Sequence, residues 1–249
     1  MKKFELFLKE LIDGRRQGLF PTLILLLLLP LSWIYSSVVF IRNQLYDKGW
    51  MRCYIPPVQL VISVGNIVAG GTGKTPVILW LMGMFYDKYT IAVLTRGYRS
   101  KAEKLEIPLI LCEEAGPSLP ASYCGDEPAM LAKRFPKAMI IVGKNRKKGC
   151  KIAAKASAQV IFLDDAFQHR RLGRDFDLVL VDGRNLFGGG YFLPRGYLRE
   201  NPTGLSRASL ILINRIENKE EFENAKKELM LYTNSPIVGI KSHVTTIKT

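Results

Sequence analysis

The chain has 249 residues, of which 48% are hydrophobic, and its 36 Lys and Arg residues outnumber its 22 Asp and Glu residues, giving a net charge of +14. This much apolar material can build a packed core, so a mainly disordered protein is excluded. The cysteines are spread between Cys53 and Cys150 without a CxxC pair, which indicates neither a disulfide scaffold nor a structural zinc site. The positive charge predicts an anionic partner: nucleic acid, a phospholipid surface or a phosphorylated small molecule.

A long apolar segment lies near the N-terminus. The uncharged run from Leu19 to Ile41 is long enough to cross a bilayer as a helix of about 20 residues. Basic residues flank it on both sides, and cationic flanks tend to stay in the cytoplasm, so a simple single span would conflict with them. Pro21 and Pro30 also interrupt backbone hydrogen bonding within the run. We expect a bent element associated with the cytosolic face of a membrane; a buried core helix is the alternative.

From Val58 onward, short β-rich apolar runs alternate with longer amphipathic runs, which is typical of βαβ units around a parallel sheet. Pro56-Pro57 should stop any preceding helix. We therefore expect residues 1–56 to form the membrane-associated helical segment and residues 57–249 an α/β domain with a mainly parallel sheet flanked by helices. The predicted strands span 59–64, 90–94, 107–111, 138–142, 159–163, 178–181, 210–213 and 237–240. The predicted helices span 74–85, 127–134, 145–157 and 219–232.

The strongest local signal is SVGNIVAGGTGKTP, residues 63–76, where a β-rich run leads into glycines and then into an apolar helix. Glycines allow backbone N–H groups to surround phosphate oxygens, Lys74 can reach the terminal phosphates, and the Thr75 hydroxyl can hold Mg²⁺. The first glycine of GxxxxGK[ST] would fall at Val68, and a glycine-rich turn with an incidental lysine is the alternative. The pattern predicts a P-loop NTPase-like domain in which ATP is bound by Gly70, Gly71, Thr72, Gly73, Lys74 and Thr75.

A pair of carboxylates follows the apolar run at 160–163. Asp164 and Asp165 would lie at the carboxyl edge of the predicted sheet, where a P-loop enzyme carries its metal-positioning acid. Acid pairs after strands are also common as turns or helix caps, and the residues alone leave both interpretations open. Asp182 follows another predicted strand and is a weaker third candidate.

Several phrases together resemble the tetraacyldisaccharide 4'-kinase (lipid A 4'-kinase) family, membrane-associated P-loop kinases of lipopolysaccharide biosynthesis. In the family's order they are VGNIVAGGTGKTP, LTRGY, GDEP, VGKNR, DDAFQHRRL and the LP and LRE of LPRGYLRE, and they lie between residues 58 and 215. The family's phosphate loop likewise lacks the first glycine. The resemblance implies a transferase that moves the ATP γ-phosphate to the 4'-hydroxyl of tetraacyldisaccharide 1-phosphate, an acylated glucosamine disaccharide phosphate. The product would be lipid IVA, formed in lipid A biosynthesis at the cytoplasmic face of the inner membrane.

The resemblance also implies roles for single residues. In GDEP, Asp126 would be the catalytic base that faces the sugar hydroxyl, acting with Lys74, and Glu127 would be a metal-side carboxylate. On the residues alone, the favoured interpretation of this phrase is a helix start with Asp126 as its cap. ATP and Mg²⁺ would also be served by Thr75, Asp164 and Asp165, and the lipid substrate by Tyr98, Arg146 and Glu200. His169 receives no clear chemical role.

A basic stretch covers residues 134–163, which contain no acid. An exposed helix face is the usual explanation of such a stretch, and nucleic-acid binding is an alternative. We favour a third interpretation, in which the basic surface holds the domain against an anionic membrane and attracts a phosphorylated substrate. No phrase typical of a nucleic-acid-binding module is evident, so no nucleic-acid partner is expected. The basic residues are Arg134, Lys137, Lys144, Arg146, Lys147, Lys148, Lys151 and Lys155.

The chain departs from the family's pattern in places. Ala166 stands where the family usually has glycine, Arg195 and Tyr197 where it usually has Ala and Pro, and Ser209 where an Asp is usual. Family members normally continue into a second lobe with a D-H-H phrase, which His243 does not match, so we expect that lobe to be incomplete or absent. The alternatives are therefore a membrane-associated P-loop ATPase or nucleotide switch without lipid kinase activity, and an inactive truncated kinase.

Overall fold

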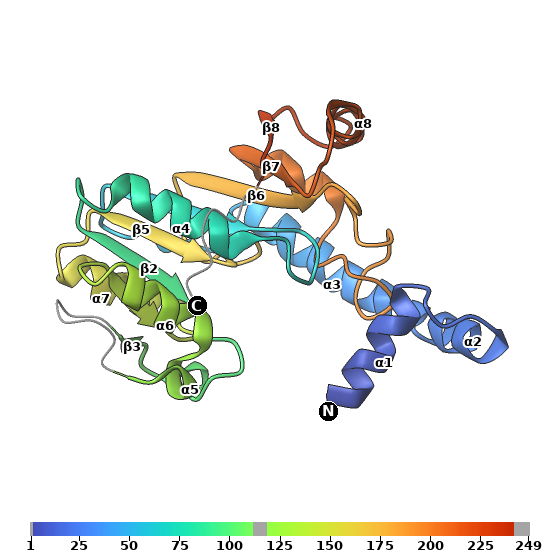
Figure 1. The fold of residues 1–249 in the computed structure, drawn as a ribbon, viewed down its shortest axis with the longest axis horizontal. Coiled ribbons are helices and arrows are strands. Elements are labelled where there is room, and N and C mark those ends of the chain that lie inside the picture. Colours follow the sequence, from blue (N-terminus) through green and yellow to red (C-terminus); the bar gives the residue numbers. More distant parts are fainter. Residues whose placement is uncertain (1, 112–118, 242–249) are drawn as a thin grey trace.

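An eight-stranded sheet runs through the computed structural model, which describes residues 2–111 and 119–241 (Figure 1). The strand order is β3-β4-β2-β5-β1-β6-β7-β8. Neighbouring strands are parallel throughout, apart from β3, which is antiparallel to β4. The strands are β1 Leu60–Gly65, β2 Ile91–Thr95, β3 Leu109–Ile110, β4 Met139–Val142, β5 Val160–Asp164, β6 Phe176–Asp182, β7 Leu210–Asn214 and β8 Ile237–Gly239.

All the predicted strands are present, and the central ones are short apolar runs that a parallel sheet buries on both faces, whereas the edge strands β3 and β8 are partly exposed. The largest differences are at β6, which begins two residues before the predicted start, and at β3, which is shorter than predicted. Pro108 precedes β3 and has no N–H to donate to a neighbouring strand, so pairing begins only at Leu109.

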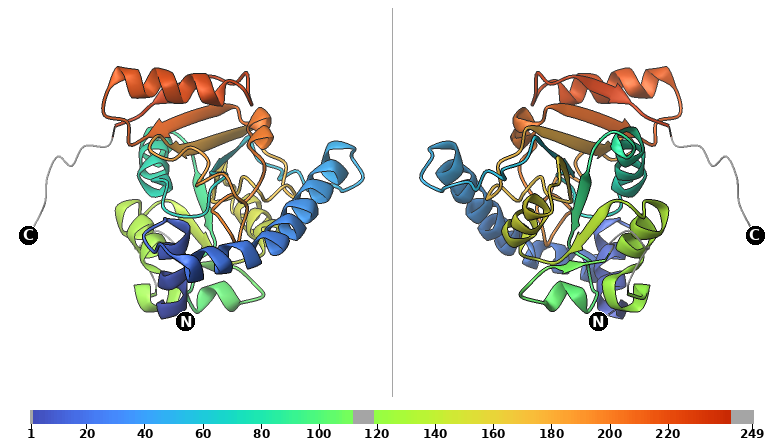
Figure 2. Two further views of the ribbon diagram at one scale, coloured as in Figure 1. Left: turned by 90° about the vertical axis from the view of Figure 1, so that its right-hand side faces the viewer. Right: turned by 90° about the vertical axis from the view of Figure 1, so that its left-hand side faces the viewer.

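Helices cover both faces of the sheet (Figure 2). On one face, α4 (Lys74–Phe85) and α6 (Asp126–Arg134) pack on a core that includes Ile62, Val64 and Phe162. On the other face, α7 (Arg146–Lys155) packs on Val61 and Ile161. Beside it, α8 (Lys219–Leu229) covers inward-facing residues of β6 and β7. The loops that carry the predicted site therefore leave the carboxyl ends of strands that are fixed from both sides.

The four predicted helices are present, with α4 at the predicted bounds and α6 beginning at Asp126. Asparagine side chains accept backbone hydrogen bonds at the start of two of them, Asn145 for α7 and Asn218 for α8, as helix-capping preferences predict. Three short elements were not predicted: α5 (Ala121–Cys124) and the 3₁₀ helices η1 (Ala102–Lys104) and η2 (Pro202–Arg207).

The N-terminal segment contains three helices, α1 (Lys2–Ile12), α2 (Leu19–Leu27) and α3 (Leu29–Asp47). Residues 1–56 were expected to be helical, but α1 was not predicted as a separate helix. The apolar run is divided at Leu28, and Pro30 lies in the first turn of α3. Pro21 lies in the first turn of α2, where a missing N–H breaks no intrahelical hydrogen bond. The expectation that Pro21 interrupts the run is therefore wrong.

The two apolar helices are exposed rather than buried in a core. Leu19–Asp47 is the one helical stretch of the described residues that is long and apolar enough to cross a membrane, and 11% of its most apolar window is buried. Leu19, Phe20, Leu27 and Trp33 are among its exposed side chains. A continuous apolar surface of this kind marks an interaction site, so the buried-helix alternative is not supported.

A loop at residues 191–200, the bridging loop, connects α3 to the loop that follows β1. Tyr35 of α3 donates its hydroxyl hydrogen to the Arg199 carbonyl at 3.1 Å. From the other side, the backbone N–H of Ala69 donates to the Tyr197 carbonyl at 2.7 Å. The apolar helix and the predicted phosphate loop thus hold the same short stretch of chain.

Candidate functional site

The loop between β1 and α4 has the backbone shape expected of a phosphate-binding loop. Gly70 and Gly73 have φ values of +125° and +86°, which favour glycine. A Cβ at Gly73 would lie 2.4 Å from Nδ2 of Asn214. The Asn66 amide donates to the Thr72 hydroxyl at 2.9 Å and ties the two ends of the loop together. The first turn of α4 contains no acid, so the positive end of its dipole is available to an anion.

Lys74 begins α4 and points to a carboxylate at the end of the neighbouring strand β5. Its Nζ lies 3.4 Å from Oδ1 of Asp165, and Nη1 of Arg199 lies 2.7 Å from the same oxygen. Burial by itself would raise the pKa of Asp165, but Arg199 and Lys74 together outweigh it and hold that pKa below its ordinary value. Asp165 is therefore an ionised anchor between the phosphate loop and the bridging loop.

Asp164 is in a different electrostatic environment. Burial raises its pKa, and the carboxylates of Asp165 and Glu127 add to that rise, while Arg146 and a hydrogen bond from Thr95 oppose it. The Thr95 hydroxyl donates to Oδ2 of Asp164 at 2.9 Å. A cation placed among these carboxylates would relieve their repulsion.

The GDEP phrase is brought to the phosphate loop by one hydrogen bond. The hydroxyl of Thr75 donates to Oε1 of Glu127 at 2.8 Å, which joins the first turn of α4 to the first turn of α6. Asp126 is the preceding residue and is exposed. The two residues expected to be catalytic are next to this hydrogen bond in the sequence: Lys74 precedes Thr75, and Asp126 precedes Glu127. They therefore lie at the same edge of the sheet.

The four residues expected on the metal side divide into a bonded pair, Thr75 and Glu127, and two strand-end carboxylates, Asp164 and Asp165. Within residues 2–111 and 119–241 no group of three or more His, Cys, Asp or Glu side chains has the arrangement of a metal site. Mg²⁺ commonly takes only one or two protein carboxylates and completes its shell with waters and phosphates. Burial is the main cause of the raised pKa of Asp164, the nearby carboxylates add to it, and a cation bound beside them would favour the ionised form.

A pocket of about 300 Å³ opens beside Asp165. Its lining carries more cations than acids and is suited to an anion. His169 is also in this lining, and burial together with the nearby arginines, first Arg146, lowers its pKa to about 4. His169 is therefore neutral at physiological pH. The lining residues are Arg96, Lys144, Arg146, Asp165, Gln168, His169 and Arg199.

Two of the residues expected on the substrate side are buried. The Arg146 guanidinium donates to the carbonyls of Leu94 and Asp164, at the ends of β2 and β5. Its position in the pocket lining leaves one part of the side chain facing the cavity. Glu200 is fully buried and accepts hydrogen bonds from Arg207 on both carboxylate oxygens, at 3.0 and 2.9 Å. Glu200 is outside the pocket lining.

Tyr98, the third such residue, is 68% exposed and lies in the turn after β2 with the Arg99 guanidinium over its ring. Asp182 forms ion pairs with Arg184 and Arg215 and does not join Asp164 and Asp165. His243 lies outside the described residues.

Several residues of the site were not predicted individually, although the phrases that contain them were. Arg199 belongs to LRE, Gln168 to DDAFQHRRL, Asn66 to VGN, and Thr95 and Arg96 to LTRGY. VGN, LTRGY and DDAFQHRRL lie at the ends of strands β1, β2 and β5, and polar residues at the ends of parallel strands meet at one edge of the sheet. That rule could have identified Asn66, Thr95, Arg96 and Gln168, but not Arg199, which follows no strand directly.

Comparisons with known proteins agree on one family. The LpxK family model, described as Tetraacyldisaccharide-1-P 4'-kinase, matches residues 24–247. A tetraacyldisaccharide 4'-kinase of Syntrophotalea carbinolica is 42% identical over 86% of this chain and 60% of its own length. Its counterpart from Halothermothrix orenii is 35% identical over 95% of this chain and 62% of its own length.

The solved structures include a similar fold, a crystal structure of LpxK from Aquifex aeolicus in complex with ATP. It superimposes with a TM-score of 0.73 at 34% identity, over 86% of this chain and 64% of that one. The chain thus spans about three fifths of the length of the curated relatives it matches. On the matched residues and the shared fold, the chain belongs to the tetraacyldisaccharide-1-P 4'-kinase family.

Proposed function

We propose that this chain is an ATP-dependent lipid kinase that transfers the γ-phosphate to the 4'-hydroxyl of tetraacyldisaccharide 1-phosphate, giving lipid IVA. Family membership supports the substrate class, and the phosphate loop supports the nucleotide. The observation that carries the proposal is the hydrogen bond between Thr75 and Glu127, because it brings the GDEP carboxylates to the end of the loop that would hold the transferred phosphate.

The phosphate side of the reaction would be served by the first turn of α4. Lys74 and the backbone N–H groups of the loop neutralise and orient the terminal phosphates. Thr75, Glu127, Asp164 and Asp165 would hold Mg²⁺, which when bound supplies charge neutralisation between the phosphates. A cation held there would favour the ionised form of Asp164.

The acceptor side would depend on Asp126. Its carboxylate is exposed at the start of α6, within one residue of the Thr75–Glu127 bond, where a sugar alcohol can approach. There it would accept the hydroxyl proton while the alcohol oxygen attacks the γ-phosphorus, the bond from that phosphorus to the β,γ-bridging oxygen breaks and ADP leaves. Phosphoryl transfer requires positioning and charge neutralisation more than covalent chemistry, so a lysine, metal-side carboxylates and one acceptor-side carboxylate are a sufficient set.

The apolar helices would bring the enzyme to its lipid substrate. We propose that residues 1–56 form a membrane-associated segment and that residues 57–249 form the kinase core at the cytoplasmic face of the inner membrane. The exposed apolar surface of α2 and α3 supports this arrangement. The bridging loop would then keep the phosphate loop at a fixed height relative to the bilayer.

The test is to incubate the purified chain with ATP, Mg²⁺ and the disaccharide lipid in detergent. A lipid heavier by one phosphate is expected from the wild type and from Asp87→Asn, a variant with an exposed aspartate changed at the far end of α4. Asp126→Asn should give almost no product. ATP hydrolysis that forms no phosphorylated lipid and does not respond to its addition would support the nucleotide-switch alternative instead.

A further inference from the structure

A cluster of cations surrounds Tyr54, in the segment between α3 and β1. The Nζ atoms of Lys147 and Lys151 lie 5.2 and 5.8 Å from the centroid of the Tyr54 ring. The backbone N–H of Tyr54 donates to the carbonyl of Arg171 at 2.9 Å. We call Arg52, Tyr54, Lys147, Lys151 and Arg171 the Tyr54 surface.

The charge of the Tyr54 surface is not neutralised by the part of the protein that the structure describes. Its four cationic residues are exposed, and none of them forms an ion pair with a carboxylate of the described residues. Helix α7 itself contains no acid, and Lys148 and Lys155 extend the positive charge along it. Exposed cations that lack internal partners are available to an external anion.

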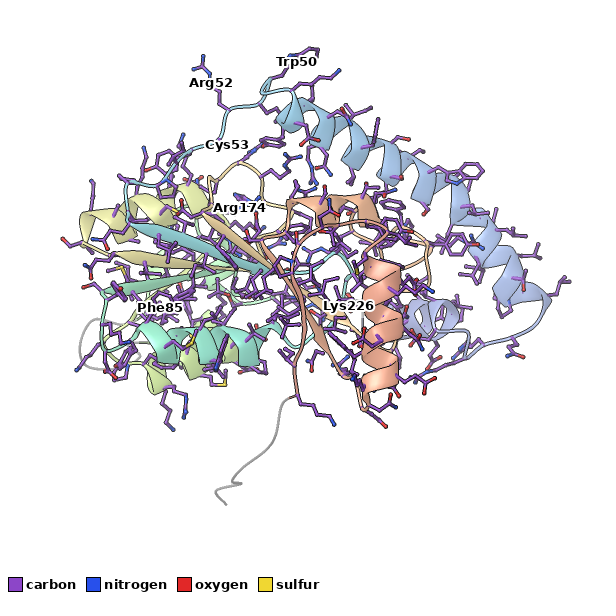
Figure 3. All side chains as sticks on the ribbon, turned by 90° about the horizontal axis from the view of Figure 1, so that it is seen from above. Trp50, Arg52, Cys53, Phe85, Arg174 and Lys226 are labelled. Carbon is purple, nitrogen blue, oxygen red and sulfur yellow. The ribbon has the colours of Figure 1, made fainter. Side chains whose placement is uncertain are left out.

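Two residues of the Tyr54 surface, Arg52 and Tyr54, lie on the segment that follows the apolar helix. Trp50 is 73% exposed, and Nζ of Lys48 lies 5.4 Å from the centroid of its ring. Trp50 and Arg52 extend from this loop away from the body of the protein (Figure 3). Helices α3 and α7 lie on the same side of the sheet (Figure 2). A tryptophan among lysines and arginines at the end of an apolar helix is typical of the headgroup level of a membrane.

We propose that the Tyr54 surface docks on the anionic headgroups of the bilayer that α2 and α3 contact. The proposal rests on the membrane placement given above and adds a second contact on the folded core, separated from the apolar helices. The exposed Trp50 and Ile55 beside the cations favour a lipid surface over a nucleic acid, because their apolar area gains nothing from a phosphodiester backbone. Two separated contacts would fix the rotation of the sheet about α3 and hold the catalytic edge in one orientation.

The test measures binding to vesicles without turnover, so that it is independent of kinase activity. The variant Lys147→Gln/Lys151→Gln is compared with Lys219→Gln/Lys227→Gln, which removes the same charge from exposed positions of α8. Each protein is titrated with vesicles of phosphatidylcholine alone, with vesicles containing phosphatidylglycerol, and with duplex DNA. Circular dichroism of each variant confirms the folded helix content.

Phosphatidylglycerol should strengthen binding of the wild type and of the α8 variant. In the Lys147/Lys151 variant this gain should fall on the order of tenfold, since each lysine near an anionic surface contributes severalfold. Binding to phosphatidylcholine should be equal in all three proteins, because α2 and α3 are unchanged. An equal gain from phosphatidylglycerol in both variants would overturn the proposal. So would a loss that appears only with duplex DNA and not with vesicles.

Discussion

The two sides of the candidate site are built differently. On the phosphate side, Lys74 and Arg199 share the carboxylate of Asp165, and Asn66 fixes Thr72 from within the loop. On the acceptor side, Asp126 is exposed, and its carboxylate forms no hydrogen bond or ion pair with any residue that the structure describes. On the phosphate side, hydrogen bonds and ion pairs within the protein already hold the side chains in place. On the acceptor side, the carboxylate of Asp126 has no such partner among the described residues.

This difference is the one that the proposed phosphoryl transfer requires. Phosphate oxygens carry full charge before and during transfer, so donors that are already in place lose nothing by being fixed. A general base must instead have a free lone pair for the incoming proton. A carboxylate already paired with an arginine, as Asp165 is, would be a poor proton acceptor. Substitutions on the phosphate side should therefore lower the affinity for ATP, whereas substitution of Asp126 should lower the rate of phosphoryl transfer.

The largest expected effect is that of Asp126→Asn on the transfer step. Removal of a general base typically lowers the rate by about 10²–10⁴-fold, while the affinity for ATP should stay within about twofold because no phosphate-side contact changes. Single-turnover transfer and equilibrium nucleotide binding measure the two quantities, with Asp87→Asn as the control. A parallel fall in ATP affinity would show that the two sides are not separate.

Arg146→Met is expected to destabilise the fold. The buried guanidinium donates to two carbonyls at the ends of β2 and β5, and its removal leaves them unsatisfied and Asp164 without its main counter-charge. A loss of about 3 kcal/mol in the free energy of unfolding follows. Denaturant unfolding measures it, with the exposed Arg134→Met as the control. Unchanged unfolding together with weaker lipid binding would instead assign Arg146 to the substrate.

The sequence predicted the features that depend on local patterns, but not those that depend on contacts between distant residues. The strands and α4 were predictable because apolar periodicity and the GGTGKT phrase are local patterns that packing does not override. The role of Asp165 was only partly predictable, since its partner Arg199 lies far along the chain and reaches it through the bridging loop. The burial of Glu200 against Arg207 was not predictable, because a charge in a sequence is expected to be exposed.

In the N-terminal segment, one prediction was wrong and one helix was missed. Pro21 was expected to interrupt a helix, but proline is tolerated in a first turn, and the place of that turn depends on where the chain enters the helix at Gly18. Helix α1 was not predicted as a separate element, although its eleven residues have the apolar spacing of an amphipathic helix, which could have identified it. Its position depends on distant contacts, such as the ion pair of Glu5 with Arg99.

Lys74→Ala tests the phosphate side. Its effect on the free energy of ATP binding should be smaller than the effect of Asp126→Asn on the activation free energy of transfer. One charge-assisted hydrogen bond contributes about 1.5–3 kcal/mol, so ATP affinity should fall about 10–100-fold. Arg199 still holds Asp165, so the fold should be retained. Equilibrium binding of a fluorescent nucleotide measures the affinity, with the exposed Lys88→Ala as the control. Unchanged affinity would remove Lys74 from the phosphate side.

His169 predicts a pH dependence of stability. Its pKa is lowered from 6.5 to about 4 in the folded protein, so between these values the unfolded chain binds a proton that the folded protein does not. The free energy of unfolding should therefore fall as the pH falls from 6.5 to 4. In His169→Asn this fall should be smaller by about 1–2 kcal/mol, after allowance for partial exposure. Identical pH profiles of thermal unfolding would contradict the assignment.

The smallest expected effect is that of Tyr35→Phe, which removes the hydrogen bond from α3 to the bridging loop. Loss of one such bond lowers the free energy of unfolding by about 1 kcal/mol. The phosphate loop is also paired with the bridging loop through Ala69 and Tyr197, so ATP affinity should change less than about twofold. Tyr46→Phe is the control on the same helix, because the Tyr46 hydroxyl has no hydrogen bond within the described part of the chain. A large loss of ATP affinity in Tyr35→Phe alone would mean that α3 sets the geometry of the phosphate loop, so that nucleotide binding would depend on the apolar N-terminal helices.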